Sequence, residues 1–339
     1  MALSTASTSH PKVSVIIPTF NRAHCLGQAI QSVLHQTFGD LELVVVDDGS
    51  TDHTPEALRH VGDDRLRILV REHRGISAAL NVGIRTARGA YIARLDSDDL
   101  WLPHMLATLV PFLDRRPEIG AVYGGAQPID KEGNPLPFMQ GIPQRYPGDS
   151  LKSLLYEDCT VSIATVIRRS CFEDVGLYDE SLKTGEDWDM TLRIARHYRL
   201  AYVEEVVAQA RYHEGNTTGP RSALFVDALD GRVKVLDKFF SNASLPISVP
   251  AMKPVAYRNL HTAVCIRWLQ AGEVRKASRS FWRAFRSGAT PTWVLARIAR
   301  FAVRRILLDR VSWKRRFVQE IGGSRRCRRK KSSAAGNKQ

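Results

Sequence analysis

The sequence predicts an α/β protein whose parallel sheet is covered by helices on both faces, followed by a helical C-terminal region. Short apolar, β-branched runs alternate with segments of helical periodicity through the first 125 residues, which is the pattern of a parallel sheet. From about Arg221 onward the segments have helical periodicity. The chain of 339 residues is 44% hydrophobic, so it can bury a sizeable core in one large domain or two.

Five buried strands and the helices between them are predicted in the N-terminal part. Val13–Ile17 is an apolar run stopped by Pro18, which is typical of a fully buried strand. Thr54 is expected to cap a helix that has Pro55 at its first position. The strands are expected at 13–17, 41–48, 66–70, 90–95 and 119–125, and the other helices at 22–36, 75–87 and 102–117.

The strand–helix alternation loosens after Gly125. A helix is expected at 149–157 and a strand at 161–169. A loop then leads to a helix whose first turn contains Glu186 and Asp187, and a strand-rich segment follows at 200–219. This part of the chain is therefore expected to add to the sheet without repeating the simple alternation.

The cysteines and the apolar segments indicate in which cellular compartment the protein is expected. The five cysteines are scattered and contain no C-x-x-C pair, so a disulfide framework or a zinc site is not expected and a reducing compartment fits better. The N-terminus lacks a basic segment followed by an apolar run, and no apolar stretch reaches 18 residues. We expect a cytoplasmic protein, placed peripherally on the inner face of the plasma membrane if its basic end binds lipid.

The net charge of +14 is concentrated at the C-terminal end. Residues 271–339 contain 20 Lys and Arg against three Asp and Glu, a net charge of +17, which leaves −3 for residues 1–270. Segment 291–320 reads as a basic amphipathic helix, which suits an anionic membrane surface. Packing of its apolar face on the body of the protein is an equal alternative. Nucleic acid is not expected as a partner, because no aromatic-interleaved recognition motif accompanies the arginines.

Acidic residues follow two of the predicted buried strands. The second strand ends in Asp47 and Asp48, and the fourth is followed by Asp96, Asp98 and Asp99. Ligands of open parallel sheets bind beyond the carboxyl ends of the strands, so these side chains are expected at one edge. The first strand is followed by "PTFNR", which has neither a G-x-G-x-x-G motif nor a P-loop, and this disfavours a dehydrogenase or a P-loop NTPase.

A carboxylate cluster at such an edge needs compensating positive charge. Mg²⁺ or Mn²⁺ supplies it, because such an ion is commonly held by one or two carboxylates with substrate phosphate oxygens completing its shell. The alternative for residues 96–101 taken alone is a solvated turn that caps a helix beginning near Pro103. The coincidence of two acidic strand ends favours a metal–diphosphate site.

Four segments carry a family resemblance: "VSVIIPTFNR", "HQTFGDLELVVVDDGSTD", "GISAALNVGIRTARGAYIARLDSDDLW" and "GLYDESLKTGEDWDMTLR". Together they resemble family 2 of the glycosyltransferases over about residues 11 to 215. The resemblance implies a GT-A fold, with a mixed, mostly parallel sheet, and an inverting enzyme that uses nucleotide-diphosphate sugars. The chain then divides into a flexible N-terminus (1–10), a GT-A catalytic domain (11–218), a helical, increasingly basic region (219–320) and a disordered basic tail (321–339).

The resemblance also implies roles for individual residues. Asp187 in "GED" is expected to be the catalytic base, with Glu186 as second choice. Where the family usually has an arginine before the asparagine of the third helix, this chain has Leu80. Residues expected to bind the nucleotide sugar are Pro18, Thr19, Asn21, Arg22, Asp47, Asp48, Asn81 and Asp96, and those expected to meet Mn²⁺ or Mg²⁺ are Asp96, Asp98, Asp99 and His213.

We therefore expect a metal-dependent inverting glycosyltransferase of hexosyl or hexosaminyl type. Its expected substrates are a nucleotide-diphosphate sugar, with UDP as the favoured nucleotide, and a glycan or lipid-linked acceptor in cell-surface glycan synthesis. One rival is a non-catalytic membrane- or nucleic-acid-binding protein on a degenerate transferase scaffold, against which the intact Asp96, Asp98 and Asp187 argue. Another is a nucleotidyltransferase, which would typically carry a glycine-rich loop where "PTFNR" stands.

Overall fold

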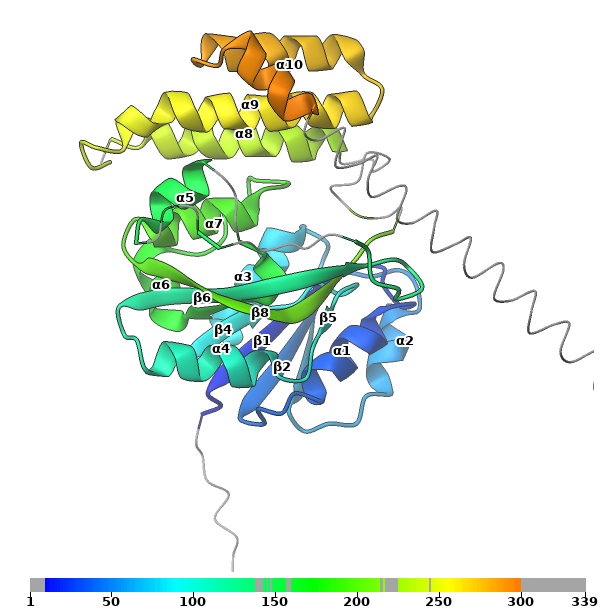
Figure 1. Ribbon diagram of the computed structural model, residues 1–339. Helices are drawn as coiled ribbons and strands as arrows, with labels where there is room; N and C mark the ends of the chain where they lie inside the picture. The colour runs from blue at the N-terminus through cyan, green and yellow to red at the C-terminus, as the bar shows by residue number, and fades with distance from the viewer. Residues whose placement is uncertain are drawn as a thin grey trace, which may run out of the picture.

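The strands of the protein form one mixed, eight-stranded sheet (Figure 1). The computed structural model describes residues 10–137, 143–144, 146, 148–156, 160–213, 216, 225–243 and 245–299. The strand order is β3-β2-β1-β4-β7-β6-β8-β5. The strands are β1 (Val13–Thr19), β2 (Leu41–Asp47), β3 (Leu66–Val70), β4 (Tyr91–Arg94), β5 (Leu100–Trp101), β6 (Ile119–Ile129), β7 (Thr165–Arg168) and β8 (Arg199–Arg211).

Strands β1 to β4 form a parallel block that aligns their carboxyl ends. β1 pairs with β2 and with β4, and β2 pairs with β3. Thr19 lies opposite Asp47, and Ile16 lies opposite Arg94. β6 and β8 are also parallel, whereas β7 runs antiparallel to β4 and β6. The expected mixed, mostly parallel sheet is confirmed, and the loops after β1, β2 and β4 emerge at one edge.

Helices cover both faces of the sheet, as predicted. Successive side chains of a strand point to opposite faces, so Val15 joins the apolar cluster that contains α1 and α4, whereas Ile16 joins the one that contains α3. The helices are α1 (Leu26–Leu34), α2 (Thr54–Arg59), α3 (Ile76–Thr86), α4 (Met105–Asp114), α5 (Ser150–Tyr156), α6 (Arg169–Val175), α7 (Glu186–Ala195), α8 (Phe225–Ser241), α9 (Lys253–Gln270) and α10 (Val274–Arg286), with 3-10 turns at Ser162–Ala164 and Pro250–Met252.

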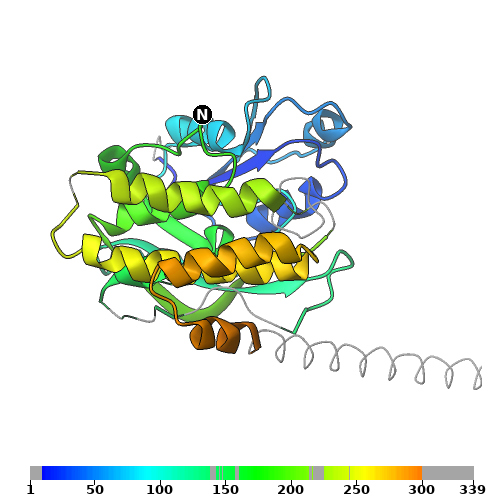
Figure 2. The ribbon, with the colours of Figure 1, turned by 90° about the horizontal axis from the view of Figure 1, so that it is seen from above.

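The C-terminal helices stack on the face of the sheet that carries α5 and α7 (Figures 1 and 2). α8 and α9 lie next to α5 and α7, and α10 lies outermost against α9. Leu236 of α8 and Trp268 of α9 belong to the same apolar cluster as Ile16 of β1. α8 packs closely against the loop before α7. A Cβ atom built on Gly231 of α8 would lie only 2.3 Å from Thr184 Oγ1 of that loop. The helical region therefore extends the core of the α/β part.

Three local features differ from the sequence prediction. Thr54 is the first residue of α2 and not its cap, because its hydroxyl accepts the backbone N–H of Arg22 at 3.0 Å. α6 occupies a segment that was expected to be a loop. β5 is a two-residue strand held by antiparallel pairing to β8, a contact between distant segments that no local pattern encodes.

The basic C-terminal end is described only in part. The predicted amphipathic helix at 291–320 is helical over residues 291–299, and its remainder lies outside the described residues. The same holds for residues 1–9 and for the expected disordered tail at 321–339. Within the described ranges, no helix is both long enough and apolar enough to cross a bilayer.

Candidate active site

Asp48, directly after β2, anchors the loop that leads into α3. Its side chain is buried, and its carboxylate accepts the backbone N–H of Gly75 at 2.7 Å and of Arg74 at 3.2 Å. It also pairs with Arg71 Nε at 3.2 Å and with His73 Nδ1 at 2.8 Å. A carboxylate at a helix N-terminus is favoured by the helix dipole. Asp48 thus fixes the wall of the site beside β2.

The loop after β1 faces the acidic loop after β4. Asn21 adopts a left-handed backbone with φ of 54°, and its Oδ1 accepts the backbone N–H of Thr51 at 2.8 Å. This contact ties the loop after β1 to the loop after β2. Pro18 lies within β1, opposite Val46. Arg22 extends toward the acidic loop after β4, where its Nε lies 4.0 Å from Asp98 Oδ2.

Two buried polar atoms at the same edge have no hydrogen-bond partner in the described part of the chain. They are Thr19 Oγ1, at the end of β1, and Asp47 Oδ2, at the end of β2. The other oxygen of Asp47 accepts the backbone N–H of Ser50 at 3.0 Å. A buried polar atom without a partner costs about 1–3 kcal/mol. This edge therefore keeps hydrogen-bonding capacity that the fold itself does not use.

The three aspartates after β4 have three different sets of partners. Asp96 accepts from Arg94 Nε at 2.7 Å. Asp98 Oδ2 lies 2.9 Å from His213 Nε2. Asp99 is buried, and its Oδ1 accepts the backbone N–H of Arg211 at 2.7 Å. Burial, together with the neighbouring Asp98 and Asp96, raises the pKa of Asp99 well above its ordinary value.

The cluster is therefore not the solvated cap that residues 96–101 would form in isolation. The side chains of Asp96 and Asp98 are 29% and 15% exposed, and Asp99 is nearly covered. α4 begins at Met105, and no side chain caps it. β5 separates the acidic loop from α4 and holds the loop against β8.

Arg94 joins the acidic loop to α7, and the sequence analysis did not predict it. The side chain is 8% exposed, and its Nη1 donates to Glu186 Oε1 at 3.0 Å while its Nε donates to Asp96. Burial alone would lower the pKa of Arg94, but the two carboxylates raise it well above its ordinary value. An arginine at the end of an apolar strand was the signal in the sequence, since such a charge requires buried partners.

Glu186 and Asp187 occupy different environments at the start of α7. Gly185 supplies the left-handed backbone, with φ of 81°, that begins the helix. Glu186 is buried against Arg94, and burial raises its pKa against the opposing effect of that arginine. Asp187 is partly exposed and lines a small cavity with Tyr178. Its Oδ1 accepts the backbone N–H of Trp188 at 2.8 Å. Asp187 is thus the more accessible carboxylate of the two.

His213 and Asn81 lie in different parts of the predicted site. His213, just beyond β8, comes within hydrogen-bonding distance of Asp98, as described above. Asn81 is buried in α3, where its Nδ2 donates to the carbonyl of Tyr178 at 2.9 Å and to Glu180 at 3.0 Å. Its Oδ1 accepts the backbone N–H of Tyr178. The amide of Asn81 is therefore occupied by the loop before α7.

Of the four residues predicted to meet the metal, Asp98 and His213 are the two whose side chains lie within hydrogen-bonding distance of each other. The 2.9 Å between Asp98 Oδ2 and His213 Nε2 is a hydrogen-bond length. It is also about the separation of two neighbouring ligands in an octahedral shell with metal–ligand distances of about 2.1 Å. Within the described ranges, no three His, Cys, Asp or Glu side chains converge on one point. A cation there would need further ligands beyond these two side chains.

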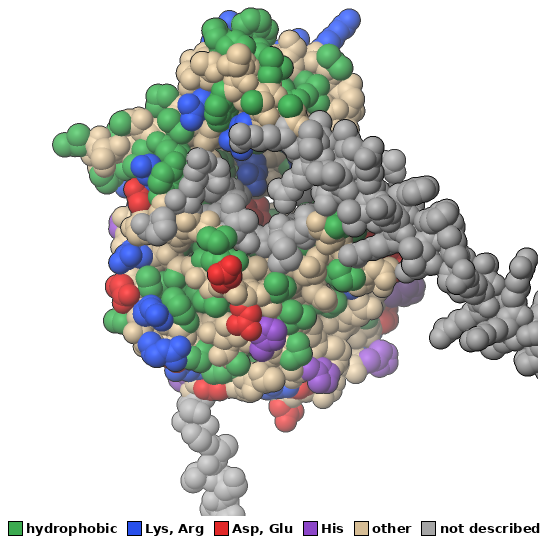
Figure 3. Space-filling model, viewed as in Figure 1, with side chains coloured by type: hydrophobic (Ala, Val, Ile, Leu, Met, Phe, Trp, Pro, Cys, Tyr) green, Lys and Arg blue, Asp and Glu red, His purple; other side chains and the backbone are tan. Residues whose placement is uncertain are grey.

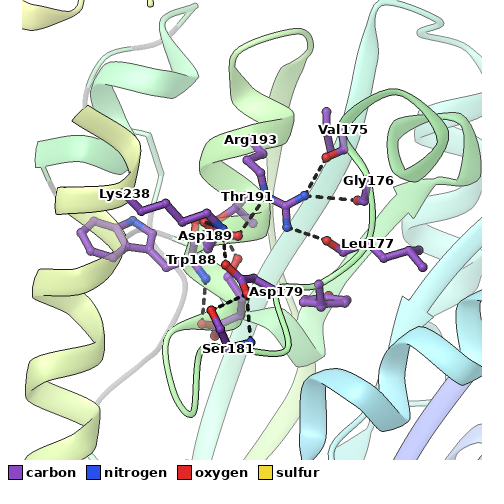
Figure 4. A network of polar contacts seen from close by, with 12 residues as sticks. Val175, Gly176, Leu177, Asp179, Ser181, Trp188, Asp189, Thr191, Arg193 and Lys238 are labelled. Atoms are coloured by element: carbon purple, nitrogen blue, oxygen red, sulfur yellow. Dashed lines mark hydrogen bonds and ion pairs between the residues drawn. The ribbon is translucent and has the colours of Figure 1, made fainter. Parts of the chain in front are cut away.

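A polar network fixes α7, the helix that carries Asp187 (Figure 4). Arg193 donates to Asp189 at 2.9 Å and to the carbonyls of the loop before α7, including that of Leu177 at 2.9 Å. Lys238 of α8 pairs with Asp189 at 2.8 Å and with Asp179 at 2.6 Å. The C-terminal helical region therefore contacts the helix of the predicted base through charged groups as well as through the core.

A shallow depression of about 470 Å³ lies at the opposite, amino-terminal ends of the strands. The cations that line it have carboxylate partners: Lys12 pairs with Asp114 at 2.9 Å, and Arg88 pairs with the buried Glu42 at 2.9 Å. None of the predicted site residues lines this depression. The carboxyl edge, where the predicted residues meet, is therefore the candidate active site.

Comparison with known sequences shows which proteins this chain resembles. The sequence profile of Glycosyl transferase family 2 matches residues 14–176. An uncharacterized glycosyltransferase of Rickettsia typhi is 33% identical over 220 residues, which cover 62% of this chain and 67% of that protein. The chondroitin synthase of Escherichia coli is 29% identical over 213 residues, which cover 61% of this chain and 30% of that enzyme. The match thus spans about two thirds of one relative and less than a third of the other.

Solved structures share the fold. The mannosyltransferase PcManGT from Pyrobaculum calidifontis, in complex with GDP-Man and Mn²⁺, gives a TM-score of 0.57 at 24% identity, covering 88% of this chain and 81% of that one. TarS of S. aureus gives a TM-score of 0.55 at 21% identity, covering 80% of this chain and 50% of that one. The expected GT-A architecture is confirmed by these similarities.

Proposed function

The chain belongs to glycosyltransferase family 2, and from that membership we propose that it transfers a sugar from a nucleotide-diphosphate sugar to a hydroxyl acceptor with inversion at the anomeric carbon. The observation that carries the proposal is the link between the two acidic motifs. Arg94 joins Asp96 to Glu186, and the partly exposed Asp187 follows Glu186 in the chain and lines a small cavity together with Arg94. Such an arrangement would bring a group for the leaving diphosphate and a base for the attacking hydroxyl to the same edge of the sheet.

Asp98 and His213 would hold the divalent cation, proposed as Mn²⁺ or Mg²⁺. When bound, such a cation supplies the positive charge that stabilises the leaving diphosphate. The Mn²⁺ in the PcManGT complex supports the proposal. Arg22, 4.0 Å from Asp98, adds a permanent positive charge on the same side of the site. We propose that Asp96 and Asp99 position the loop, since both are engaged by protein donors.

Asp187 is proposed as the general base. Its Oδ1 is engaged by the N–H of Trp188, so its Oδ2 is the oxygen that takes the proton from the acceptor hydroxyl. A positioned general base contributes about 10²–10⁴-fold to the rate. Glu186 is less suited to this role because it is buried and paired with Arg94. A single in-line displacement with Asp187 behind the acceptor hydroxyl inverts the anomeric carbon.

We propose that the nucleotide binds along the ends of β1 and β2, with UDP as the favoured nucleotide. The unpaired Thr19 Oγ1 and Asp47 Oδ2 support this placement. The solved neighbours include TarS in complex with UDP-GlcNAc and PcManGT in complex with GDP-Man. The sugar is proposed to be a hexose or hexosamine, and the acceptor a glycan or lipid-linked sugar of the cell surface. A thermal-shift screen of UDP- and GDP-sugars with Mn²⁺ tests the donor, and stabilisation by GDP-sugars alone would overturn UDP.

Two substitutions test the assigned roles. Asp187→Asn is expected to retain donor binding and to lose at least about 100-fold in kcat, the contribution of a general base. Asp98→Ala is expected to lose the stimulation by Mn²⁺ of sugar-nucleotide hydrolysis. Asp64→Asn, at an exposed aspartate just before β3 and away from the carboxyl ends of the strands, is the matched control and should behave as the parent does. Normal turnover by Asp187→Asn would show that the base is a different residue.

A further inference from the structure

The outer face of α10 carries an exposed row of cationic and aromatic side chains. Ala277, Ser280 and Ala284 are buried against α9. On the opposite side of the helix, at positions i, i+4, i+7 and i+11, lie Arg275, Arg279, Trp282 and Arg286, with Phe285 beside them. Trp282 is 54% exposed and Phe285 is 43% exposed. These five residues are called the outer face of α10 below.

The charge of this face is uncompensated. α10 has no Asp or Glu among its 13 residues, and its five cations are all exposed. Lys276 pairs with Glu273 at 3.5 Å, but no ion pair is formed by Arg275, Arg279 or Arg286 with any part of the chain that the structure describes. The helical region at the top of Figure 3 accordingly shows hydrophobic and basic side chains together.

We infer that the outer face of α10 is a docking surface for an anionic lipid bilayer. Cations close to an anionic leaflet are each attracted to it, and a tryptophan between them can place its ring at the level of the headgroups. The buried side of α10 is already occupied by α9, so the helix stays part of the fold and adsorbs through its outer row. Binding of this kind is peripheral, reversible and weakened by salt.

Two other occupants of this face are less suited to it than a bilayer: the basic C-terminal residues of the chain itself and nucleic acid. Residues 300–339 contain 14 Lys and Arg against two Asp and Glu, so they repel the outer face of α10 and do not complement it. The same excess of cations would favour the same anionic leaflet. Nucleic acid would be attracted by the charge, but an exposed Trp–Phe pair with ring centroids 5.7 Å apart at an edge-on angle of 89° offers no flat platform for stacked bases.

The test compares vesicle binding of the full-length chain with that of two triple variants. One is Arg275→Gln, Arg279→Gln, Arg286→Gln, and its matched control is Arg59→Gln, Arg85→Gln, Arg115→Gln, which removes equal charge from exposed sites on α2, on α3 and after α4. On vesicles of phosphatidylcholine mixed with phosphatidylglycerol, the first variant is expected to partition at least about tenfold more weakly than the control. Vesicles of phosphatidylcholine alone should bind none of the three chains strongly.

A second pair of variants tests the aromatic contribution without a change of charge. Trp282→Ala is expected to weaken binding to the anionic vesicles several-fold, whereas Val70→Ala, at a valine that is 71% exposed on β3, should not. Equal partitioning of the two triple variants would overturn the inference. A second outcome would also overturn it. If the triple variant on α10 lost binding to duplex or single-stranded oligonucleotides but bound the vesicles as the parent does, the face would be assigned to nucleic acid.

Discussion

At the scale of single residues, Arg94 connects two motifs that are far apart in the sequence. It ends β4, directly before the acidic loop, and its partner Glu186 begins α7, 92 residues later. Its guanidinium bonds to two carboxylates in fixed directions, which a lysine ammonium cannot reproduce. Because each partner lies beside a residue of the proposed reaction, Arg94 is a positioning residue for both Asp98 and Asp187.

We expect Arg94→Lys to fold and to lose activity, and Arg94→Met to be strongly destabilised. The lysine keeps the charge but loses one of the two bonds, so kcat should fall about tenfold or more. The methionine leaves Glu186 buried without its ion-pair partner, which typically costs about 3–5 kcal/mol. Denaturant unfolding and steady-state kinetics measure the two effects.

Arg65→Lys is the matched control, because Arg65 likewise donates two hydrogen bonds to carboxylate oxygens, in its case both of Asp63, but lies away from the proposed site. It should change kcat little. Full activity in Arg94→Lys would mean that the link between the acidic loop and α7 does not position the reacting groups.

At the scale of elements, α8 is fastened to α7 through Lys238, which bridges Asp179 and Asp189 (Figure 4). Burial alone would raise the pKa of Asp179, but hydrogen bonds from Lys238 and Ser181 lower it to about 2. The ordinary value is 3.8, so the folded state holds the ionised form more tightly than the unfolded chain does. This stabilisation is present above pH 3.8 and is lost as the pH falls toward 2.

The stability of Asp179→Asn should therefore differ from that of the parent in a pH-dependent way. Above about pH 4 the variant is expected to unfold at lower denaturant concentration, because it lacks the charge that Lys238 binds. The difference in stability between the variant and the parent should shrink as the pH falls below about 4 and vanish near the folded pKa of Asp179, which is about 2. Asp64→Asn, at an exposed aspartate, serves as the control. A difference that stayed constant between pH 6 and pH 2.5 would contradict the assignment.

At the scale of the whole molecule, one apolar cluster joins the sheet to the helical region. It contains Val44 and Leu80 from the α/β part together with Leu236 and Val264 from α8 and α9. The division of the chain near residue 218 stays a prediction, since it came from the extent of the family resemblance and from the helical periodicity that begins at about Arg221. Because this core is shared, separating the α/β part from the helical region would expose core residues of both.

We therefore expect the full chain to unfold in one cooperative transition, with calorimetric and van't Hoff enthalpies in agreement. A chain ending at residue 218 should be aggregation-prone, because it would expose the apolar surface that α8 and α9 cover. Two separate thermal transitions would show that the helical region is an independent domain. Unfolding with Mn²⁺ and without it controls for stabilisation by bound ligand.

The sequence was sufficient for elements whose information is local. β1 and β2 were recognisable from their apolar runs, and the acidic residues after β2 and β4 from their place in the strand order. What the sequence could not supply were pairings between distant segments. Arg94 meets Glu186, β5 pairs with β8, and Lys238 reaches α7, and each contact exists only once the chain has folded.

The contacts of the acidic loop also set an order of events during synthesis. Asp98 and His213 are 115 residues apart, and Asp99 and Arg211 are 112 apart. At about 5–20 residues per second, the ribosome makes the loop on the order of ten seconds before β8 and His213 emerge. Until then Asp98 lacks its contact with His213, and Asp99 lacks its hydrogen bond from Arg211. In the nascent chain, the acidic loop can therefore reach its final contacts only after β8 has been made, when most of the α/β part has been translated.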